Sequence, residues 1–440
     1  MAARETLSFH AEPFGVRIDP AVIEDLRARV RSARLPEPAP GEPWAQGTDR
    51  NWLSGLLTYW AEGFDWFAAE RELNRFAHYR ARIGSTVVHF VHETARAGTG
   101  IPLILGHGWP SCFAELLPLV PLLTDPAAHG IDGPAFDVVI PSLPGYGFSP
   151  RPDVAGGVTY RYVARLWREL MRGLGYPRYA AGGGDFGAGI ATFMALDDPR
   201  PLLGLHLTNL ELAPYTGPGS RPLSAAERRF LRQSQRWDQT ELGYTAIQST
   251  KPQTVGYALN DSPAGLAAWI LEKWRSWSDC GGDPESRFTR DFLLTVVTLY
   301  WVTSTITSSM RDYYDNRRWQ GEPRLGPDDR ARVPTAVAVF PHMLVPEGQP
   351  PREWAERLYD IRRWTVMPQG GHFAAAEAPG LVARDIVTFF ASLDRLRRVS
   401  TRSRRRFARA AGPRGRCAWR TPRSCGRKPS AGTCRCSGAN

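Results

Sequence analysis

Two stretches of the sequence alternate short apolar strands with helical patterns. Residues 85–212 contain five strand candidates, and residues 333–394 contain two more before an amphipathic helix over Gly380–Leu393. The strand candidates are Thr86–His92, Pro102–Gly106, Phe136–Pro141, Tyr179–Gly182, Leu203–Thr208, Thr335–Phe340 and Trp364–Met367.

The stretch between them, residues 213–332, contains no convincing strand. Its patterns predict helices, for example over Gly265–Trp277 and Phe292–Tyr314. A sheet that is interrupted and then resumed predicts an α/β fold with one mostly parallel central sheet and an inserted helical cap.

Segments of different composition flank the predicted sheet. Residues 1–84 precede it, and their aromatic-rich, helical pattern over 7–80 predicts a helical N-terminal extension. Residues 395–440 follow it and hold 15 Lys and Arg but no Asp or Glu. This composition predicts a disordered, non-functional tail, with attachment to nucleic acid or anionic lipid as the alternative.

The net charge of +11 belongs to that tail, because the other 394 residues hold 40 basic and 44 acidic side chains. We therefore expect no specific nucleic-acid partner for the body of the protein. Four of the six cysteines also lie in the tail without paired CxxC spacing. The body keeps only Cys112 and Cys280, which argues against a disulfide framework.

The sequence contains no apolar run of roughly 18 residues, the length that a membrane span needs. Its first residues, MAARETLSFHAE, carry charges where a signal peptide has an apolar core. We therefore expect a soluble, cytoplasmic protein.

A glycine-rich turn, YAAGGGDFGAG over Tyr179–Gly189, joins a predicted strand to a predicted helix. Gly182, Gly184 and Gly187 match the dinucleotide pattern G-x-G-x-x-G, and Glu211 follows at the distance of a ribose-binding acid. A dinucleotide site is therefore one interpretation, and a purely structural turn is another.

The same turn also matches G-x-D-x-G, with Asp185 at the position of the nucleophile in a nucleophile elbow. A carboxylate here would repel a bound pyrophosphate, which disfavours the dinucleotide interpretation. The elbow is therefore favoured, with Asp185 as the predicted nucleophile.

The tetrapeptide HGWP follows the apolar strand IPLIL. Backbone N–H groups in such a loop can stabilise an oxyanion together with the N–H of the residue after the nucleophile. We therefore predict an oxyanion hole made by Trp109 and Phe186, in a loop shaped by His107, Gly108 and Pro110. A plain turn after a strand is the alternative.

His372 follows the predicted strand Trp364–Met367 and two glycines, in a loop that could reach across the sheet edge to the elbow. An isolated histidine in a loop is usually only a surface residue, but the order of nucleophile and then histidine fits this fold. An Asp nucleophile that attacks an alkyl carbon forms an ester, and water activated by His372 could then hydrolyse it. Epoxides and alkyl halides are suitable substrates.

From about Leu7 to Leu393 the chain resembles an α/β-hydrolase-fold epoxide hydrolase of the microsomal, or juvenile-hormone, type. The resemblance rests on the N-terminal segment DLRARVRSARLP…WAQG…YWAEGFDWFAAERELN, on HGWP, on GGGDFGAG and on QGGHFAAAEAP. It also rests on two cap stretches, GYTAIQSTKPQTVGYALNDSPAGLAAWILEKW and LYWVTSTITSSMRDYYDN. The resemblance implies that residues 1–84 are the family's N-terminal extension.

The resemblance also implies a cofactor-free and metal-free enzyme that opens a small apolar epoxide to a vicinal diol. It identifies Tyr313 as the proton donor and Tyr244 as the second phenol that binds the epoxide oxygen, roles that suit a phenol facing an alkoxide. Ordinary aromatic packing is the alternative for both tyrosines.

The sequence departs from the family at the acid that orients the histidine. Met343 occupies the family's usual position, and Met cannot support an imidazolium. Glu347, in the same loop, is the favoured substitute, and Glu211 is the alternative. A haloalkane dehalogenase and a catalytically impaired protein that binds apolar ligands remain rival interpretations. A homodimer is compatible with the sequence.

Overall fold

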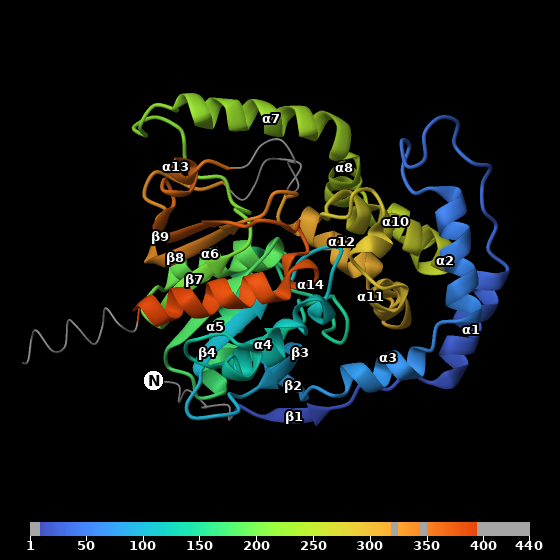
Figure 1. Cartoon of the computed structure of the whole chain (residues 1–440), viewed down its shortest axis with the longest axis horizontal. Coiled ribbons are helices and arrows are strands. Elements are labelled where there is room, and N and C mark those ends of the chain that lie inside the picture. The colour runs from blue at the N-terminus through green and yellow to red at the C-terminus, as the bar shows by residue number, and fades with distance from the viewer. Residues whose placement is uncertain (1–8, 318–323, 344–349, 394–440) are drawn as a thin grey trace, which may run out of the picture. The chain divides into compact units, whose positions relative to one another are not determined.

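The structure is a computed structural model that describes residues 9–317, 324–343 and 350–393. These residues form a nine-stranded sheet in the order β1-β2-β3-β5-β4-β6-β7-β8-β9 (Figure 1). The basic tail predicted over 395–440 lies outside the described residues. The strands are β1 (Ala11–Phe14), β2 (His78–Ile83), β3 (Thr86–Glu93), β4 (Ile101–Gly106), β5 (Phe136–Pro141), β6 (Tyr179–Gly183), β7 (Leu202–Leu207), β8 (Ala331–Val339) and β9 (Tyr359–Val366).

The six strands from β5 to β9 in this order pair in parallel, and β1, β2 and β3 extend the sheet in antiparallel fashion. The predicted mostly parallel sheet is therefore confirmed. In parallel α/β sheets the loops at the carboxyl ends of the strands meet at one edge, which is where ligand sites form.

The prediction that residues 7–80 are helical is wrong at both ends, where β1 and β2 pair with each other. Helices do fill the rest of the extension, and each begins at an aspartate whose side chain accepts a backbone N–H of the first turn. These helices are α1 (Pro20–Arg31), α2 (Arg50–Glu62) and α3 (Trp66–Leu73).

Helices alone connect β7 to β8 among the described residues, and they form the predicted cap. They are α7 (Ala225–Glu241), α8 (Gly243–Thr250), α9 (Pro252–Asp261), α10 (Pro263–Ser276), α11 (Arg290–Val302) and α12 (Ile306–Asp315). The N-terminal extension lies beside this cap, with α1 and α2 next to α10 (Figure 1).

The single helix predicted over Phe292–Tyr314 is wrong, because the chain bends by 83° between α11 and α12. Ser304, at the break, has a left-handed backbone with φ +52°. The hydroxyl of Thr303 donates to the carbonyl of Leu299 at 2.6 Å and contacts the hydroxyl of Thr305 at 2.8 Å. Such bonds from side chains to the backbone compete with a continuing helix.

Helices also cover the two faces of the sheet. α6 (Phe186–Asp197) follows β6 directly and is buried along nearly its whole length, so it forms the centre of the core. α5 (Tyr160–Gly173) packs beside it. The other helices outside the extension and the cap are α4 (Leu119–Thr124), α13 (Arg352–Ala355), α14 (Ala374–Glu377) and a helix over 379–393. Within the described parts of the chain, no single helix has both the length and the apolar composition of a membrane span, and only the bent pair of α11 and α12 passes that test jointly.

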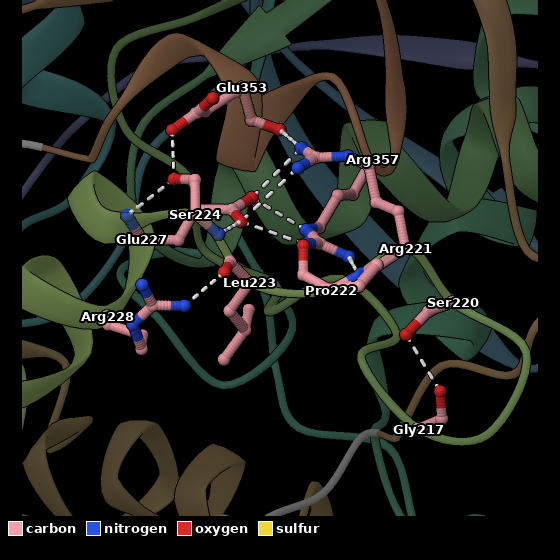
Figure 2. Close-up of polar contacts among 10 residues, drawn as sticks. All are labelled: Gly217, Ser220, Arg221, Pro222, Leu223, Ser224, Glu227, Arg228, Glu353 and Arg357. Atoms are coloured by element: carbon pink, nitrogen blue, oxygen red, sulfur yellow. Dashed lines mark hydrogen bonds and ion pairs between the residues drawn. The ribbon is translucent and has the colours of Figure 1, made fainter.

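A buried ion cluster attaches the start of the cap to the core (Figure 2). The carboxylate of Glu227, on the first turn of α7, accepts hydrogen bonds from Arg357 at 2.6 and 2.8 Å and from Arg221 at 2.9 Å. Ser224 and Glu227 also form a capping box, so the same carboxylate begins the helix and anchors it. Arg357 holds the pKa of Glu227 down at about 2.

Candidate active site

The glycine-rich turn is a sharp elbow that places Asp185 between β6 and α6. Asp185 has φ +50°, a conformation that few residues other than glycine adopt, and its N–H donates to the side-chain oxygen of Asn209 at 2.8 Å. Gly187 has to be glycine, because a Cβ there would lie 2.2 Å from the carbonyl oxygen of Gly106. The close packing of α6 on β4 therefore accounts for the glycines, and the strained backbone exposes the carboxylate at the sheet edge.

One oxygen of the Asp185 carboxylate occupies a pair of backbone donors. Its Oδ1 accepts the N–H of Trp109 at 3.0 Å and the N–H of Phe186 at 2.8 Å. These are the two donors that the sequence predicts for an oxyanion hole. The first amide of α6 thus donates to the protein's own carboxylate, so the geometry gives the dinucleotide interpretation no support.

The loop residues around Trp109 shape this hole. A Cβ on Gly108 would lie 2.2 Å from the Asp185 side chain, so only glycine permits the contact. His107 is buried and accepts the N–H of Leu143 at Nε2, at 3.2 Å, and burial lowers its pKa to about 4. The carbonyl of Pro110 accepts the indole N–H of Trp274, a cap residue, at 3.2 Å. These three residues therefore position the backbone of the loop.

His372 lies opposite the other carboxylate oxygen, with its Nε2 at 3.5 Å from Oδ2 of Asp185. Its backbone N–H donates to the carbonyl of Trp277 at 2.8 Å, and its ring packs edge-on against Trp277 and Phe373. Burial lowers the pKa of His372 to about 4, although the charge of Glu211 acts in the opposite direction. The imidazole is therefore neutral at physiological pH, as a general base must be.

The acid that orients His372 is not fixed by the described residues. Nδ1 of His372 has no hydrogen-bond partner among them. Glu211 is near enough to act on His372 electrostatically, and its Oε1 accepts the hydroxyl of Tyr160 at 2.7 Å. Glu347 lies in residues 344–349, outside the described residues. That segment follows Met343, whose neighbour His342 pairs with Gly371.

Tyr244 on α8 and Tyr313 on α12 come from the cap and meet over Trp109. The ring of Tyr244 stacks on that of Trp109, with centroids 5.3 Å apart, and Tyr313 packs edge-on against both. Both tyrosines are buried, whereas Tyr314 is 54% exposed. The structure thus brings the two predicted phenols together beside the oxyanion loop and distinguishes Tyr313 from its neighbour.

A charged cluster that sequence reasoning missed holds α12 in place. Arg151, in the loop after β5, donates to Asp312 at 2.7 Å and to Asp315 at 2.5 Å. Asp315 also accepts the N–H of Val158 at 2.7 Å. Asp312 and Asp315 flank Tyr313 in the sequence RDYYDN, and that pattern was the available signal. Their contacts with the core fix the helix that carries the phenol.

Two cavities lie at this site. A cavity of about 820 Å³ between the N-terminal extension and the cap includes Trp44, Tyr244 and Ile247 in its lining. A much smaller one, of about 10 Å³, contacts Asp185 and His372. A further groove of about 670 Å³ runs along α3 and α4 and does not include these residues. Among residues 9–317, 324–343 and 350–393, no three His, Cys, Asp or Glu side chains are grouped so that they could hold a metal ion.

Comparisons with known proteins agree with this geometry. Residues 11–116 match the family model described as "Epoxide hydrolase N terminus", and residues 101–285 match that of the alpha/beta hydrolase fold. The chain is 37% identical to epoxide hydrolase 1 of Sus scrofa over 87% of its own length and 89% of that protein.

Solved structures are similar as well. The crystal structure of juvenile hormone epoxide hydrolase from Bombyx mori matches with a TM-score of 0.77 at 30% identity, over 90% of this chain and 97% of that one. The Aspergillus niger epoxide hydrolase matches with a TM-score of 0.75 at 28% identity, over 88% and 97% of the two chains. Identity at this level over nearly the whole length of its relatives shows that the chain belongs to the epoxide hydrolase family of the α/β-hydrolase fold.

Proposed function

We propose that this protein is an epoxide hydrolase that opens a small apolar epoxide to a vicinal diol through an ester on Asp185. One observation carries the proposal. The two oxygens of Asp185 are in different surroundings, with Oδ1 held by two backbone N–H groups and Oδ2 facing His372.

This asymmetry assigns the two oxygens different roles in the first step. Oδ2 attacks an oxirane carbon, and the carbon–oxygen bond of the ring breaks. The epoxide oxygen leaves as an alkoxide and takes a proton from Tyr313, while Tyr244 holds it with a second hydrogen bond. Oδ1 stays in its two hydrogen bonds and becomes the carbonyl oxygen of the ester.

The second step is hydrolysis of that ester. Neutral His372 takes a proton from water as the water oxygen bonds to Cγ, and the negative charge develops on Oδ1, where Trp109 and Phe186 already donate. The Cγ–Oδ2 bond then breaks, and the departing alkoxide takes the proton from His372. The proton on the new carboxylic acid restores the Tyr313 phenol, so protons balance over the cycle.

The larger cavity lies beside one of the proposed reacting groups, Tyr244. Its lining combines apolar residues, Leu53, Ile247 and Trp269, with charged ones, Arg34, Glu241 and Lys273. A cavity of this size suits a small organic molecule. The cavity also contacts the N-terminal extension, so that segment forms part of the proposed binding site.

The test is a single turnover of the His372→Gln variant with styrene oxide, followed by intact mass measurement. Without the base, the ester should accumulate as an adduct of one substrate mass. The adduct should be absent from Asp185→Ala, which serves as the control. A wild-type enzyme that forms diol while His372→Gln forms no adduct would disprove the ester and favour direct attack of water on the epoxide.

A further inference from the structure

Glu115 is a buried carboxyl beside the proposed reacting groups that the two steps above do not use. It lies in a short 3-10 helix (Phe113–Leu116) just after the oxyanion loop and is only 8% exposed. A carboxyl is costly to bury, so its presence in the core needs a physical reason.

The position of Glu115 supplies such a reason. Glu115 lines the cavity of about 10 Å³ that also contacts Asp185, His372 and Ser111. One water molecule needs about this much room and two to four polar partners. Glu115 also lines a second cavity, of about 20 Å³, that contacts His206.

The electrostatics make Glu115 suitable as a partner for water. Burial raises its pKa to about 8, the hydroxyl of Ser111 opposes the shift, and the charge of Asp185 adds to it. The carboxyl is therefore neutral at pH 7. A neutral carboxyl can accept a hydrogen bond at its carbonyl oxygen without placing a second negative charge beside the oxyanion that forms on Asp185.

We propose that Glu115 positions the hydrolytic water between itself and His372 for attack on the Asp185 ester. One O–H of the water points to Nε2 of His372, the other donates to the carboxyl of Glu115, and a lone pair is left facing Cγ of Asp185. Hydrogen bonds from both hydrogens fix the orientation of the water before it attacks, which lowers the entropic cost of ester hydrolysis. The inference rests on the proposed function, because it needs the ester.

The experiment separates the two chemical steps with styrene oxide in wild type, Glu115→Gln and Glu115→Met. Rapid quench and intact mass give the rate constants for ester formation and ester hydrolysis. Glu115→Met removes the acceptor and should slow hydrolysis at least about tenfold, with ester formation unchanged within about twofold. Glu115→Gln keeps a neutral carbonyl acceptor at the same place and should slow hydrolysis less than about threefold.

Two further variants complete the design. Cys112→Ala changes a buried residue of the same turn that lines neither cavity, and it should leave both rate constants as in wild type. Glu115→Asp shortens the side chain by one methylene and so moves the carboxyl away from the water. It should slow ester hydrolysis and leave ester formation unchanged. This variant provides the test if Glu115→Met does not fold.

The inference is overturned if ester hydrolysis in Glu115→Met is as fast as in the wild type. If Glu115→Met does not fold, the same result in Glu115→Asp overturns it. It is equally overturned if both steps slow by the same factor, since that would indicate a structural role. These results are distinct from a failure of the proposed function. In that case His372→Gln itself forms no ester, whatever residue occupies position 115.

Discussion

The core and the cap supply the two halves of the site, and they hold their residues by different means. In the core, the Asp185 carboxylate is held by the backbone N–H groups of Trp109 and Phe186. The backbone N–H of His372 donates to Trp277, at the end of the cap helix α10. In the cap, the rings of Tyr244 and Tyr313 pack against Trp109 and against each other. Backbone donors persist when side chains change, whereas ring contacts do not. We therefore expect the core half to determine the chemistry and the cap half to adjust its rate and the substrates accepted.

The cap itself is attached to the core at two buried ion clusters that differ in what they support. Arg151 holds α12, the helix that carries Tyr313, and Arg357 holds the first turn of α7 through Glu227 (Figure 2). Both arginines are at most 10% exposed. The contribution of each cluster to stability should thus be comparable, while only the first should affect catalysis.

The largest effect is expected in the core half. Asp185→Ala removes the carboxylate that forms the ester in the proposed mechanism, so kcat for styrene oxide should fall by at least about 10⁴-fold. Far-UV circular dichroism and the urea midpoint show whether the variant stays folded. A folded Asp185→Ala enzyme with more than a hundredth of the wild-type activity would contradict the assignment.

The cap half should give a graded response. Tyr313→Phe should slow ester formation by roughly 10² and Tyr244→Phe by less, because the other phenol still binds the oxygen. The double variant should lose more than the two single effects combined, because no phenol is then left to replace the other. Tyr314→Phe is the matched control, since that ring is exposed. Slower hydrolysis of a preformed ester in either single variant would be inconsistent with these roles.

The two ion clusters are compared through Arg151→Met and Arg357→Met. Each leaves buried carboxylates without their main partner, so each should lower the free energy of unfolding by about 3 kcal/mol. Urea titration measures that change. Only Arg151→Met should also slow ester formation, by about tenfold, because Asp312 and Asp315 flank Tyr313. Equal kinetic losses in the two variants would mean that the whole cap, rather than α12, sets the position of the phenol.

The smallest effect concerns pH. His372 has its pKa lowered to about 4, so it remains a neutral base as the pH falls from 7 to 5.5, a range in which Glu115, with its pKa raised to about 8, also keeps its proton. The rate constant for ester hydrolysis should therefore change less than about twofold over that range and fall only as the pH approaches 4. Single-turnover hydrolysis of the ester in buffers from pH 7 to 4 measures it. A midpoint near 6.5, the ordinary value for histidine, would contradict the lowering of the pKa of His372 by burial.

The same lowered pKa values affect stability with a definite sign. His107 and His372 are neutral in the folded protein down to about pH 4, whereas unfolded histidine takes up a proton near pH 6.5. Their contribution to stability is therefore complete above pH 6.5 and is lost as the pH falls from 6.5 to 4. Urea midpoints at pH 7.5 and 5 should show this loss in wild type and less of it in His107→Asn.

The cytoplasmic location and the homodimer remain predictions from the sequence. Cell fractionation and the molar mass in solution are the measurements that address them. The choice between Glu347 and Glu211 as the acid behind His372 is also still a prediction, and separate Glu→Gln variants would decide it. The variant that loses the acid should show the larger drop in the rate of ester hydrolysis.

The sequence by itself predicted seven of the nine strands, the mostly parallel sheet, the elbow at Asp185, the oxyanion loop and the place of His372. Each of these is a local pattern, in which glycines, a charged residue and an apolar strand lie within about ten positions of one another. Local sterics and the placement of chemistry at strand ends are enough to interpret them. The break between α11 and α12 was missed because hydroxyl bonds to the backbone override an otherwise helical pattern.

Only the tertiary structure showed that Tyr313 is buried while Tyr314 is exposed, placed Arg151 against Asp312, and put Glu115 in the lining of the small cavity at Asp185. These contacts join residues that are far apart in the chain or differ by one position on a helix. Their energies depend on burial and on the partner across the interface, and neither is encoded within a single segment of sequence.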